Sequence, residues 1–305
     1  MTIRRMRDAL LMHEDLNFLL TNRVPRRALT LLVGRLSRIE NRWFARVGIA
    51  VWGAFTELDL SEAQQRSFNS LRACFTRALK PGSRPQVMSD DVVTSPCDAI
   101  VGAMGCVGEV GAGQLLQAKG MPYRLEDLLG SVAEAARWEG AHFVTLRLTS
   151  AMYHRFHAPY AGRLSHVRYI SGDTWNVNPV ALQRVQQLFA RNERAVLRLD
   201  LTNGTELALV PVAAILVASI RLHALDVTLN LNWAGATEMR CDHAFDKGEE
   251  LGWFEHGSTI IVLAPRGLRW AAGISPGQRI RVGQALLVGA RGGAGPAMPG
   301  PVSSP

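Results

Sequence analysis

Residues 207–220 read LALVPVAAILVASI, which is the longest apolar stretch of the 305-residue chain. A helix of this length is too short to cross a bilayer, and Pro211 would interrupt it. The stretch is rich in Val and Ile, whose branched side chains favour an extended backbone. It therefore predicts a strand buried inside a sheet and not a membrane-spanning helix.

Further runs rich in Val and Ile follow residue 98, separated by Gly, Asn and Asp, and predict more strands, mostly antiparallel. Turns such as Thr202-Asn203-Gly204 are typical of the hairpins that join such strands. The expected strands are 98–107, 142–148, 163–170, 195–201, 225–231 and 259–263. The expected helices beyond the first 55 residues are 59–79, 125–138 and 180–189.

The segment Arg26–Phe55 contains no proline, and its apolar residues recur at the spacing of one amphipathic helix. The apolar stripe comprises Leu29, Leu32, Val33, Leu36, Ile39, Trp43, Val47, Ala50 and Val51. Either the stripe packs against the protein's own core, or it lies in a membrane interface with arginines near anionic headgroups. Aromatic residues interleaved with arginines favour the interface. The expected membrane contacts are Arg35, Arg38, Arg42, Trp43 and Arg46.

The composition, 48% hydrophobic and 20% charged, excludes a disordered or fibrous chain. The net charge of +8 predicts an anionic partner, and residues 1–56 hold ten arginines against four acidic residues. Because no nucleic-acid recognition motif accompanies this charge, a membrane surface is favoured over nucleic acid. Only three of the 34 basic residues are lysines. The four cysteines form no C-x-x-C pair and are expected to be reduced thiols in a cytosol-facing protein that lacks a secretory signal.

The sequence Lys80-Pro-Gly-Ser-Arg-Pro85 marks a boundary, because two prolines and a glycine end regular structure. The domains that we expect are a helical, membrane-associating segment at 1–80, a catalytic core at 81–287 and a disordered tail at 288–305. The predicted fold class is α+β, with N-terminal membrane-associating helices followed by a strand-rich, mostly antiparallel catalytic core.

Three short clusters could carry chemistry: 96–99 (PCDA), 153–159 (YHRFHAP) and 255–261 (EHGSTII). Each is a weak signal alone. An aspartate beside a turn usually caps backbone, and H-x-x-H without a third ligand predicts no metal site. Gly257-Ser258 lacks the pattern of a nucleophile elbow. Together, however, the clusters supply an acid, a base and a hydroxyl, the set that activates a serine.

With these clusters, the sequence resembles the phosphatidylserine decarboxylases, pyruvoyl enzymes that make phosphatidylethanolamine. The resemblance spans about residues 20–287. Its motifs are 75–85 (FTRALKPGSRP), 96–99 (PCDA), 117–120 (QAKG), 153–159 (YHRFHAP), 172–173 (GD) with 177–178 (VN), 188–194 (LFARNER) and 257–259 (GST). Two positions depart from the family's pattern: Ala99 replaces a glycine, and His256 replaces a leucine.

The resemblance implies a proenzyme that cuts itself between Gly257 and Ser258, giving a β chain (1–257) and an α chain (258–305) that stay associated. His157, oriented by Asp98, would take the Ser258 hydroxyl proton. The resulting ester would eliminate and hydrolyse, which turns Ser258 into a pyruvoyl group, the one cofactor implied. That group would form a Schiff base with phosphatidylserine, and His154 is a candidate proton donor. The scarcity of lysine agrees with a cofactor built from the chain itself.

The implied partner is phosphatidylserine in the membrane, with no nucleic acid, and the resemblance is compatible with a homodimer of the αβ unit. The implied location is the cytoplasmic face of the cell membrane, as a peripheral protein. Two alternatives stay open from the sequence. One is a serine hydrolase that uses Asp98, His157 and Ser258 on an external ester or peptide. The other is a membrane-binding homologue that no longer matures.

Overall fold

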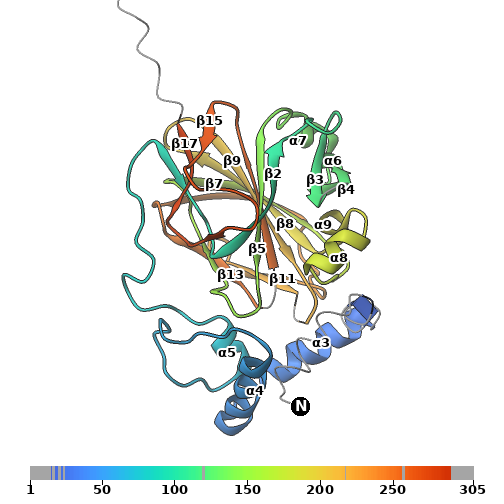
Figure 1. The fold of residues 1–305 in the computed structure, drawn as a ribbon, viewed down its shortest axis with the longest axis vertical. Coiled ribbons are helices and arrows are strands. Elements are labelled where there is room, and N and C mark those ends of the chain that lie inside the picture. Colours follow the sequence, from blue (N-terminus) through green and yellow to red (C-terminus); the bar gives the residue numbers. More distant parts are fainter. Residues whose placement is uncertain are drawn as a thin grey trace, which may run out of the picture.

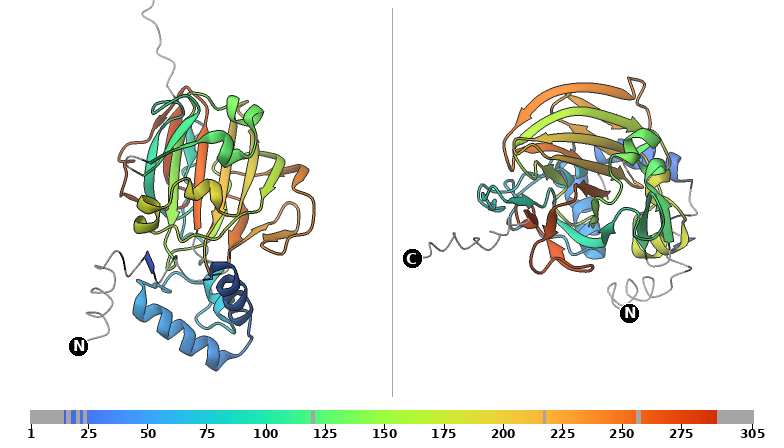
Figure 2. Two further views of the ribbon diagram at one scale, coloured as in Figure 1. Left: turned by 90° about the vertical axis from the view of Figure 1, so that its right-hand side faces the viewer. Right: turned by 90° about the horizontal axis from the view of Figure 1, so that it is seen from above.

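A computed structural model describes residues 15, 18, 19, 22, 25–118, 121–216, 218–255 and 258–289. Its class is α+β, with many antiparallel strands and few helices. A strand-rich body stands above three helices of the N-terminal region, α3 (Arg26–Ser37), α4 (Arg42–Phe55) and α5 (Leu71–Phe75) (Figure 1). Figure 2 shows from a second direction that these helices lie at one end of the body.

An eight-stranded antiparallel sheet forms the centre of the body, in the order β12-β7-β8-β9-β14-β5-β2-β16. The strands are β12 (Glu238–Phe245), β7 (Gly162–Ile170), β8 (Arg194–Leu201), β9 (Glu206–Ala213), β14 (Ser258–Ala264), β5 (His142–Leu148), β2 (Ala99–Cys106) and β16 (Arg279–Ile280). Every residue of β14 is buried. Both faces of this strand are covered, and after Ser258 and Thr259 it is a continuous apolar run, IIVLA, without polar alternation.

The two faces of the large sheet pack against different layers. One face packs on a four-stranded sheet of β11 (Val227–Asn230), β10 (Ser219–Leu222), β13 (Glu250–Phe254) and β6 (Arg155–His157). The other is covered by α6 (Leu125–Leu129), α7 (Val132–Ala136), α8 (Pro179–Arg184) and α9 (Leu188–Arg191). Two small sheets join β1 (Val92–Thr94), β17 (Ala285–Gly289) and β15 (Leu268–Trp270), and β3 (Gln114–Ala118) with β4 (Met121–Arg124).

The stretch 207–220 is strand-forming, as predicted, but it does not form one strand. Its first part belongs to β9 and its last two residues to β10, which lies in the other sheet. Between them the backbone turns, with positive φ at Leu216 and Ala218. The turn lets one apolar stretch supply both layers of the same core, which sequence periodicity does not reveal.

Several expected helices are shorter than predicted. The segment 125–138 divides into α6 and α7, because Gly130 takes a left-handed conformation (φ 67°) that ends the first helix. The segment 180–189 divides into α8 and α9 around Gln187, which is also left-handed. Within 59–79 only α5 is helical. The expected tail also begins later, since 288 and 289 belong to β17; the rest of it lies outside the described residues.

The predicted single helix over 26–55 is two helices, α3 and α4. The break is at Asn41, whose side-chain oxygen accepts hydrogen bonds from the backbone N–H of Trp43 (3.0 Å) and Phe44 (2.9 Å). Such a side-chain cap stabilises a helix start, and so it competes with continuation from α3. Across the described part of the chain, no helix is both long and apolar enough to span a membrane.

Candidate active site

Ser258 is the first residue of β14, where its ladder partners are Leu148 of β5 and Ala213 of β9. The residue is fully buried, and its hydroxyl has no hydrogen-bond partner within the described residues. A buried hydroxyl without a partner is costly, so the fold retains it here against a stability cost. Gly257 and His256, on the other side of the expected cleavage point, lie outside the described residues.

His157, on β6, has a defined tautomer. Its Nδ1 lies 2.9 Å from the carbonyl oxygen of Gly248, which can only accept, so Nδ1 carries the proton. Nε2 lies 3.0 Å from the Tyr153 hydroxyl, from which it accepts a hydrogen bond. Burial lowers the pKa of His157 from its ordinary value. The imidazole is therefore a neutral base, and the lone pair on its unprotonated Nε2 accepts the hydrogen bond from Tyr153.

Asp98 lies close to His157 but bonds to other groups. Its carboxylate accepts hydrogen bonds from Arg84 Nε (2.8 Å to Oδ1) and from the backbone N–H of Val282 (2.9 Å). The His157 backbone N–H donates to Pro96, two residues before Asp98. The charge of Asp98 acts on His157 by raising its pKa, although burial lowers that pKa by more. The structure thus brings acid and base together without a direct hydrogen bond between them.

His154 is fully buried. Its Nδ1 donates to the carbonyl oxygen of Met152 (2.8 Å), and its ring lies against Phe75 of α5, with 4.1 Å between ring centroids. Its own carbonyl accepts from the N–H of Phe254, at the end of the strand that leads to the cleavage point. Because Nδ1 holds the proton, Nε2 of the neutral ring is an acceptor and must be protonated before it can donate.

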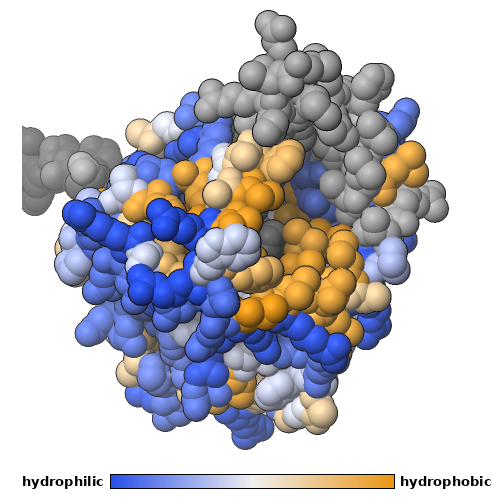
Figure 3. Space-filling model, turned by 90° about the horizontal axis from the view of Figure 1, so that it is seen from below, coloured by the Kyte–Doolittle hydropathy of each residue, from blue (hydrophilic) through white to orange (hydrophobic). Residues whose placement is uncertain are grey.

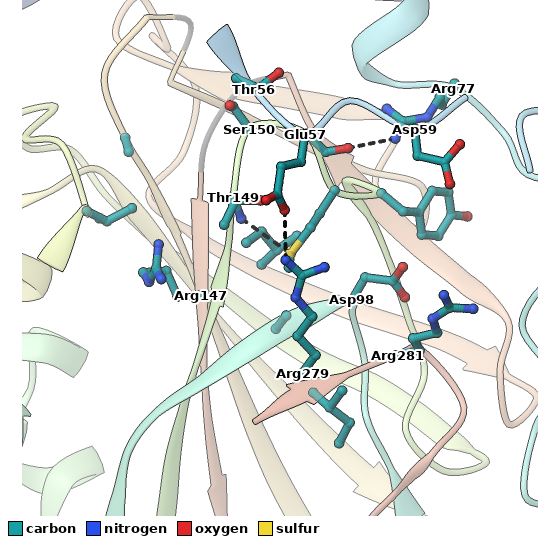
Figure 4. Close-up of a pocket in the computed structure, with 18 of the residues that line it drawn as sticks. Thr56, Glu57, Asp59, Arg77, Asp98, Arg147, Thr149, Ser150, Arg279 and Arg281 are labelled. Atoms are coloured by element: carbon teal, nitrogen blue, oxygen red, sulfur yellow. Dashed lines mark hydrogen bonds and ion pairs between the residues drawn. The ribbon is translucent and has the colours of Figure 1, made fainter. Parts of the chain in front are cut away.

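A cavity of about 650 Å³ opens beside these residues (Figure 4). Asp98 and Tyr153 line it, together with the end of β5 and residues 214–216, which follow β9; β5 and β9 are the two strands that flank Ser258. Residues 56–62 of the N-terminal region and 279–281 of the C-terminal part form further walls. Five arginines line the cavity: Arg77, Arg84, Arg147, Arg279 and Arg281. Arg77 and Arg84 belong to the 75–85 motif but were not expected to line a site, and Arg147, Arg279 and Arg281 lie in no motif of the sequence analysis.

Two comparisons with known proteins bear on this geometry. The family model for phosphatidylserine decarboxylase matches residues 71–288. A phosphatidylserine decarboxylase proenzyme of Brevibacillus brevis is 35% identical over 273 residues, covering 88% of this chain and 95% of the relative. The proenzymes of Anaeromyxobacter sp. and Shewanella baltica are 39% and 38% identical, each covering 86% of this chain and 94% and 93% of the relatives. The chain belongs to the phosphatidylserine decarboxylase family.

Two motifs that carry the likeness to the phosphatidylserine decarboxylase family make buried polar contacts, and one of them reaches the ladder partner of Ser258. In the LFARNER motif, Asn192 Nδ2 donates to the carbonyl of Ala213 (3.0 Å), and the Ala213 N–H donates to the backbone carbonyl of Glu193 (2.8 Å). Ala213 is the ladder partner of Ser258. In the QAKG motif, Gln117 Nε2 donates to the carbonyls of Leu182 and Val185, which ties β3 to α8. The Asn192 side chain therefore holds the backbone beside Ser258, whereas the Gln117 side chain holds β3 against α8.

The departure at Ala99 from the pattern of phosphatidylserine decarboxylases is compatible with the fold. Ala99 begins β2 and is fully buried, and it is not among the described residues with positive φ. The turn therefore does not need the conformational freedom of glycine. The departure at His256 lies outside the described residues.

The helices α3 and α4 expose most of the apolar stripe, whereas Ile49 and Trp52, which lie outside it, pack against the small core around Phe68 and Cys74. The exposed apolar side chains are Leu32, Leu36 and Ile39 in or just after α3, and Trp43, Val47, Val51 and Phe55 in α4. Contacts to the body use polar groups instead: Arg26 pairs with Asp173 (2.6 Å), and Thr30 accepts from the N–H of Leu216. Apolar surface gathers on the underside of the molecule (Figure 3). The interpretation that the stripe packs on the protein's own core is therefore wrong.

The expected membrane-contact arginines divide into two groups. Arg35 and Arg46 are exposed. Arg38 pairs with Glu255 (3.1 Å), and Arg42 reaches Ser67 (3.5 Å). Arg38 therefore already forms an ion pair with the body of the protein. About half of its side chain, 52%, stays exposed and could contact a lipid headgroup. Trp43 is 75% exposed and is the most prominent member of the apolar stripe.

Proposed function

We propose that this chain is a self-processing phosphatidylserine decarboxylase that forms phosphatidylethanolamine and CO₂. The observation that carries the proposal is the buried hydroxyl of Ser258, which has no hydrogen-bond partner among the described residues, beside a cavity that is lined by Asp98 and lies next to a neutral His157. Such an arrangement suits a serine that reacts with its own backbone better than one that must meet an external ester.

His157 Nε2 is the base for self-cleavage between Gly257 and Ser258. Tyr153 must release Nε2 so that it can take the Ser258 hydroxyl proton, while Gly248 keeps the ring in the required tautomer. The serine oxygen attacks the Gly257 carbonyl, and the peptide bond gives way to an ester. Elimination leaves the Gly257 carboxylate, and hydrolysis releases ammonia and leaves a pyruvoyl group at position 258. Asp98 supports the positive charge that His157 gains.

The surroundings of Ser258 fit a pyruvoyl group. Leu148 and Ala213 flank the position on either side, and both are buried. Loss of the hydroxyl replaces an unbonded buried polar atom by an apolar methyl group, which this apolar site accommodates. When present, the group supplies an electrophilic carbonyl that accepts electrons as CO₂ leaves. His154 is the proposed proton donor afterwards, once its Nε2 is protonated.

The α and β chains stay associated after cleavage because the α chain supplies the central strand. β14 pairs along its length with β5 and β9, both of which lie in the β chain. β15, β16 and β17 also belong to the α chain, and β16 and β17 pair with β2 and β1. Separation of the chains would expose this core. A homodimer of the αβ unit stays a prediction.

The exposed stripe of α3 and α4 supports peripheral binding at the cytoplasmic face of the cell membrane. The exposed Phe55, which ends α4 after the stripe, directly precedes Thr56 and Glu57, which line the cavity. A lipid could therefore place its headgroup in the cavity while its acyl chains stay near α4. Transfer of a whole diacyl lipid into water would cost about 0.8 kcal/mol per CH₂, so the enzyme gains by working at the interface.

Intact mass spectrometry of the purified protein tests the proposal. We expect fragments 1–257 and 258–305, the smaller one lacking its amino group, together with CO₂ release from phosphatidylserine vesicles. The Ser258→Ala variant should show neither. An uncleaved chain that hydrolyses esters would instead identify a serine hydrolase. An uncleaved chain that binds vesicles without releasing CO₂ would identify a homologue that does not mature.

A further inference from the structure

The cavity beside Ser258 is rich in arginine, but most of this charge is already compensated. Three of the arginines form ion pairs: Arg84 with Asp98 (2.5 Å), Arg279 with Glu57 (3.0 Å) and Arg281 with Glu62 (3.3 Å). Arg77 donates to backbone carbonyls, including that of Ala151 at 2.9 Å. These arginines hold the walls of the cavity together and are not free to bind a ligand without breaking a contact.

Arg147 differs from the other four. Within the described residues, its guanidinium makes no hydrogen bond or ion pair with any protein group, although it lines the same cavity. Arg147 is half-buried, and burial lowers the pKa of its guanidinium. The pKa falls because a cation is less stable away from water. A half-buried arginine without an acidic partner should bind an anion with a more favourable free energy than an exposed arginine does. Part of its hydration is already lost, so less must be given up on binding.

The place of Arg147 suits a substrate that reacts at position 258. Arg147 precedes Leu148, the ladder partner of Ser258, and pairs with Thr259 in β14. Figure 4 shows it on the other side of the cavity from the Arg279–Glu57 pair. An anion bound there would lie near the end of β14 without touching the paired arginines.

We propose that Arg147 binds the phosphodiester of the phosphatidylserine headgroup, an inference that rests on the proposed function. The headgroup offers two anions, the phosphodiester and the carboxylate. An arginine paired with the carboxylate would stabilise the ground state of the group that must lose its charge as CO₂, and so would slow the reaction. An arginine paired with the phosphodiester positions the substrate and leaves the carboxylate free to react. The planar guanidinium also fits two phosphate oxygens at once.

Binding to the full-length Ser258→Ala chain tests the proposal independently of decarboxylation, because this variant stays uncleaved. Calorimetric titration would use glycerophosphoserine, glycerophosphoethanolamine and L-serine as probes. With Arg147→Gln added, we expect about ten- to a hundredfold weaker binding of both phosphodiesters and unchanged binding of serine. Arg147→Lys should recover part of the loss, because it keeps the charge but not the planar fork.

Arg279→Gln is the matched control. It removes a cationic side chain from the same cavity, but this side chain already forms an ion pair with Glu57. It should change phosphodiester affinity less than threefold. Equal affinity of the Arg147→Gln and parent chains for both phosphodiesters would overturn the proposal, as would a selective loss of serine binding. In the processed enzyme, Arg147→Gln should raise KM for phosphatidylserine and still give fragments 1–257 and 258–305. Failure of the parent chain to cleave would instead refute the proposed function.

Discussion

Arg72 Nε donates to Glu255 Oε1 over 2.7 Å and joins α5 to the residue three positions before Ser258. The Glu255 side chain is fully buried, and its second oxygen receives Arg38 from the end of α3. A buried carboxylate needs such partners, because an unpaired buried charge is strongly destabilising. The segment proposed to be cut is thus held on its upstream side by α5 and by the end of α3.

Loss of the Arg72 contact should slow self-cleavage and weaken the fold. The Arg72→Gln variant leaves the buried Glu255 with Arg38 alone, so we expect the free energy of unfolding to fall by about 2–3 kcal/mol. Misplacement of the upstream segment should also slow cleavage by at least about tenfold. Denaturant unfolding of Ser258→Ala proteins measures the first effect, and a time course of intact mass after cell-free synthesis measures the second.

Arg42→Gln is the control, because Arg42 is an exposed arginine of the same region with one long contact to Ser67. It should leave both quantities within error. If Arg72→Gln cleaves at the parent rate, the ion pair has no part in positioning the scissile peptide.

Polar substitution of the α4 stripe should weaken membrane binding without weakening the fold. Trp43 and Val51 are 75% and 54% exposed, so the Trp43→Ser, Val51→Ser double variant should change the free energy of unfolding by less than about 1 kcal/mol. Two apolar side chains that enter the interface together contribute enough for about tenfold weaker partitioning onto phosphatidylserine vesicles. Co-sedimentation measures the binding. Val132→Ser in α7, 69% exposed but far from the stripe in sequence, should bind vesicles like the parent.

The pH dependence of self-cleavage should report His157. Burial lowers its pKa below the ordinary value near 6.5, so the neutral base persists as the pH falls through 6.5. We expect a constant cleavage rate from about pH 8 to pH 6.5, with a decline only at lower pH, followed by gel densitometry after a pH jump. A rate that halves near pH 6.5 or above would show that His157 is not the buried base described here.

Asp98 and Arg84 can be separated by substitution, although each is the other's partner. Asp98→Asn removes the charge that favours protonated His157, so cleavage should slow at least about a hundredfold. Arg84→Gln keeps that charge and should slow cleavage far less. Circular dichroism confirms that both variants are folded. Equal slowing by the two substitutions would mean that Asp98 acts through its contact with Arg84 and not through His157.

Glu193 should make the fold less stable as the pH rises. Burial raises the pKa of its carboxyl from 4.5 to about 8, and the Tyr169 hydroxyl bonds to both this carboxyl and the Asn230 carbonyl. The folded state therefore keeps a proton that the unfolded chain loses above pH 4.5, and stability falls between pH 4.5 and 8. The slope from this group is at most about 1.4 kcal/mol per pH unit.

The Glu193→Gln variant should lack this slope, because its amide stays neutral and can still donate to Tyr169. Thermal unfolding of Ser258→Ala proteins with and without Glu193→Gln, at pH 5 to 8, would show the difference. Parallel curves would mean that Glu193 is ionised in the folded protein.

Local patterns predicted much of the secondary structure. The strand at 142–148 is β5 with the same bounds, and the predicted strand at 163–170 differs from β7 by one residue. The polar strand β12 escaped prediction, because it lies at the sheet edge, where exposed and half-buried residues alternate without an apolar run. The prediction of a single helix over 26–55 was wrong. The spacing of apolar residues carries no information about the side-chain cap at Asn41, which starts a new helix there.

The sequence alone determined the α+β class and the strand-rich core, because backbone preference acts over a few neighbouring positions. Through short motifs it also proposed Asp98, His154, His157 and Ser258 as site residues, and their roles stay predictions. The tertiary structure decided which groups meet. It paired Asp98 with Arg84, left the Arg147 guanidinium with no partner in the part of the chain that the structure describes, and joined Arg72 to Glu255 across 183 positions of the chain. It also turned the apolar stripe toward solvent. Such contacts depend on how sheets and helices pack, and no periodicity in the sequence encodes them.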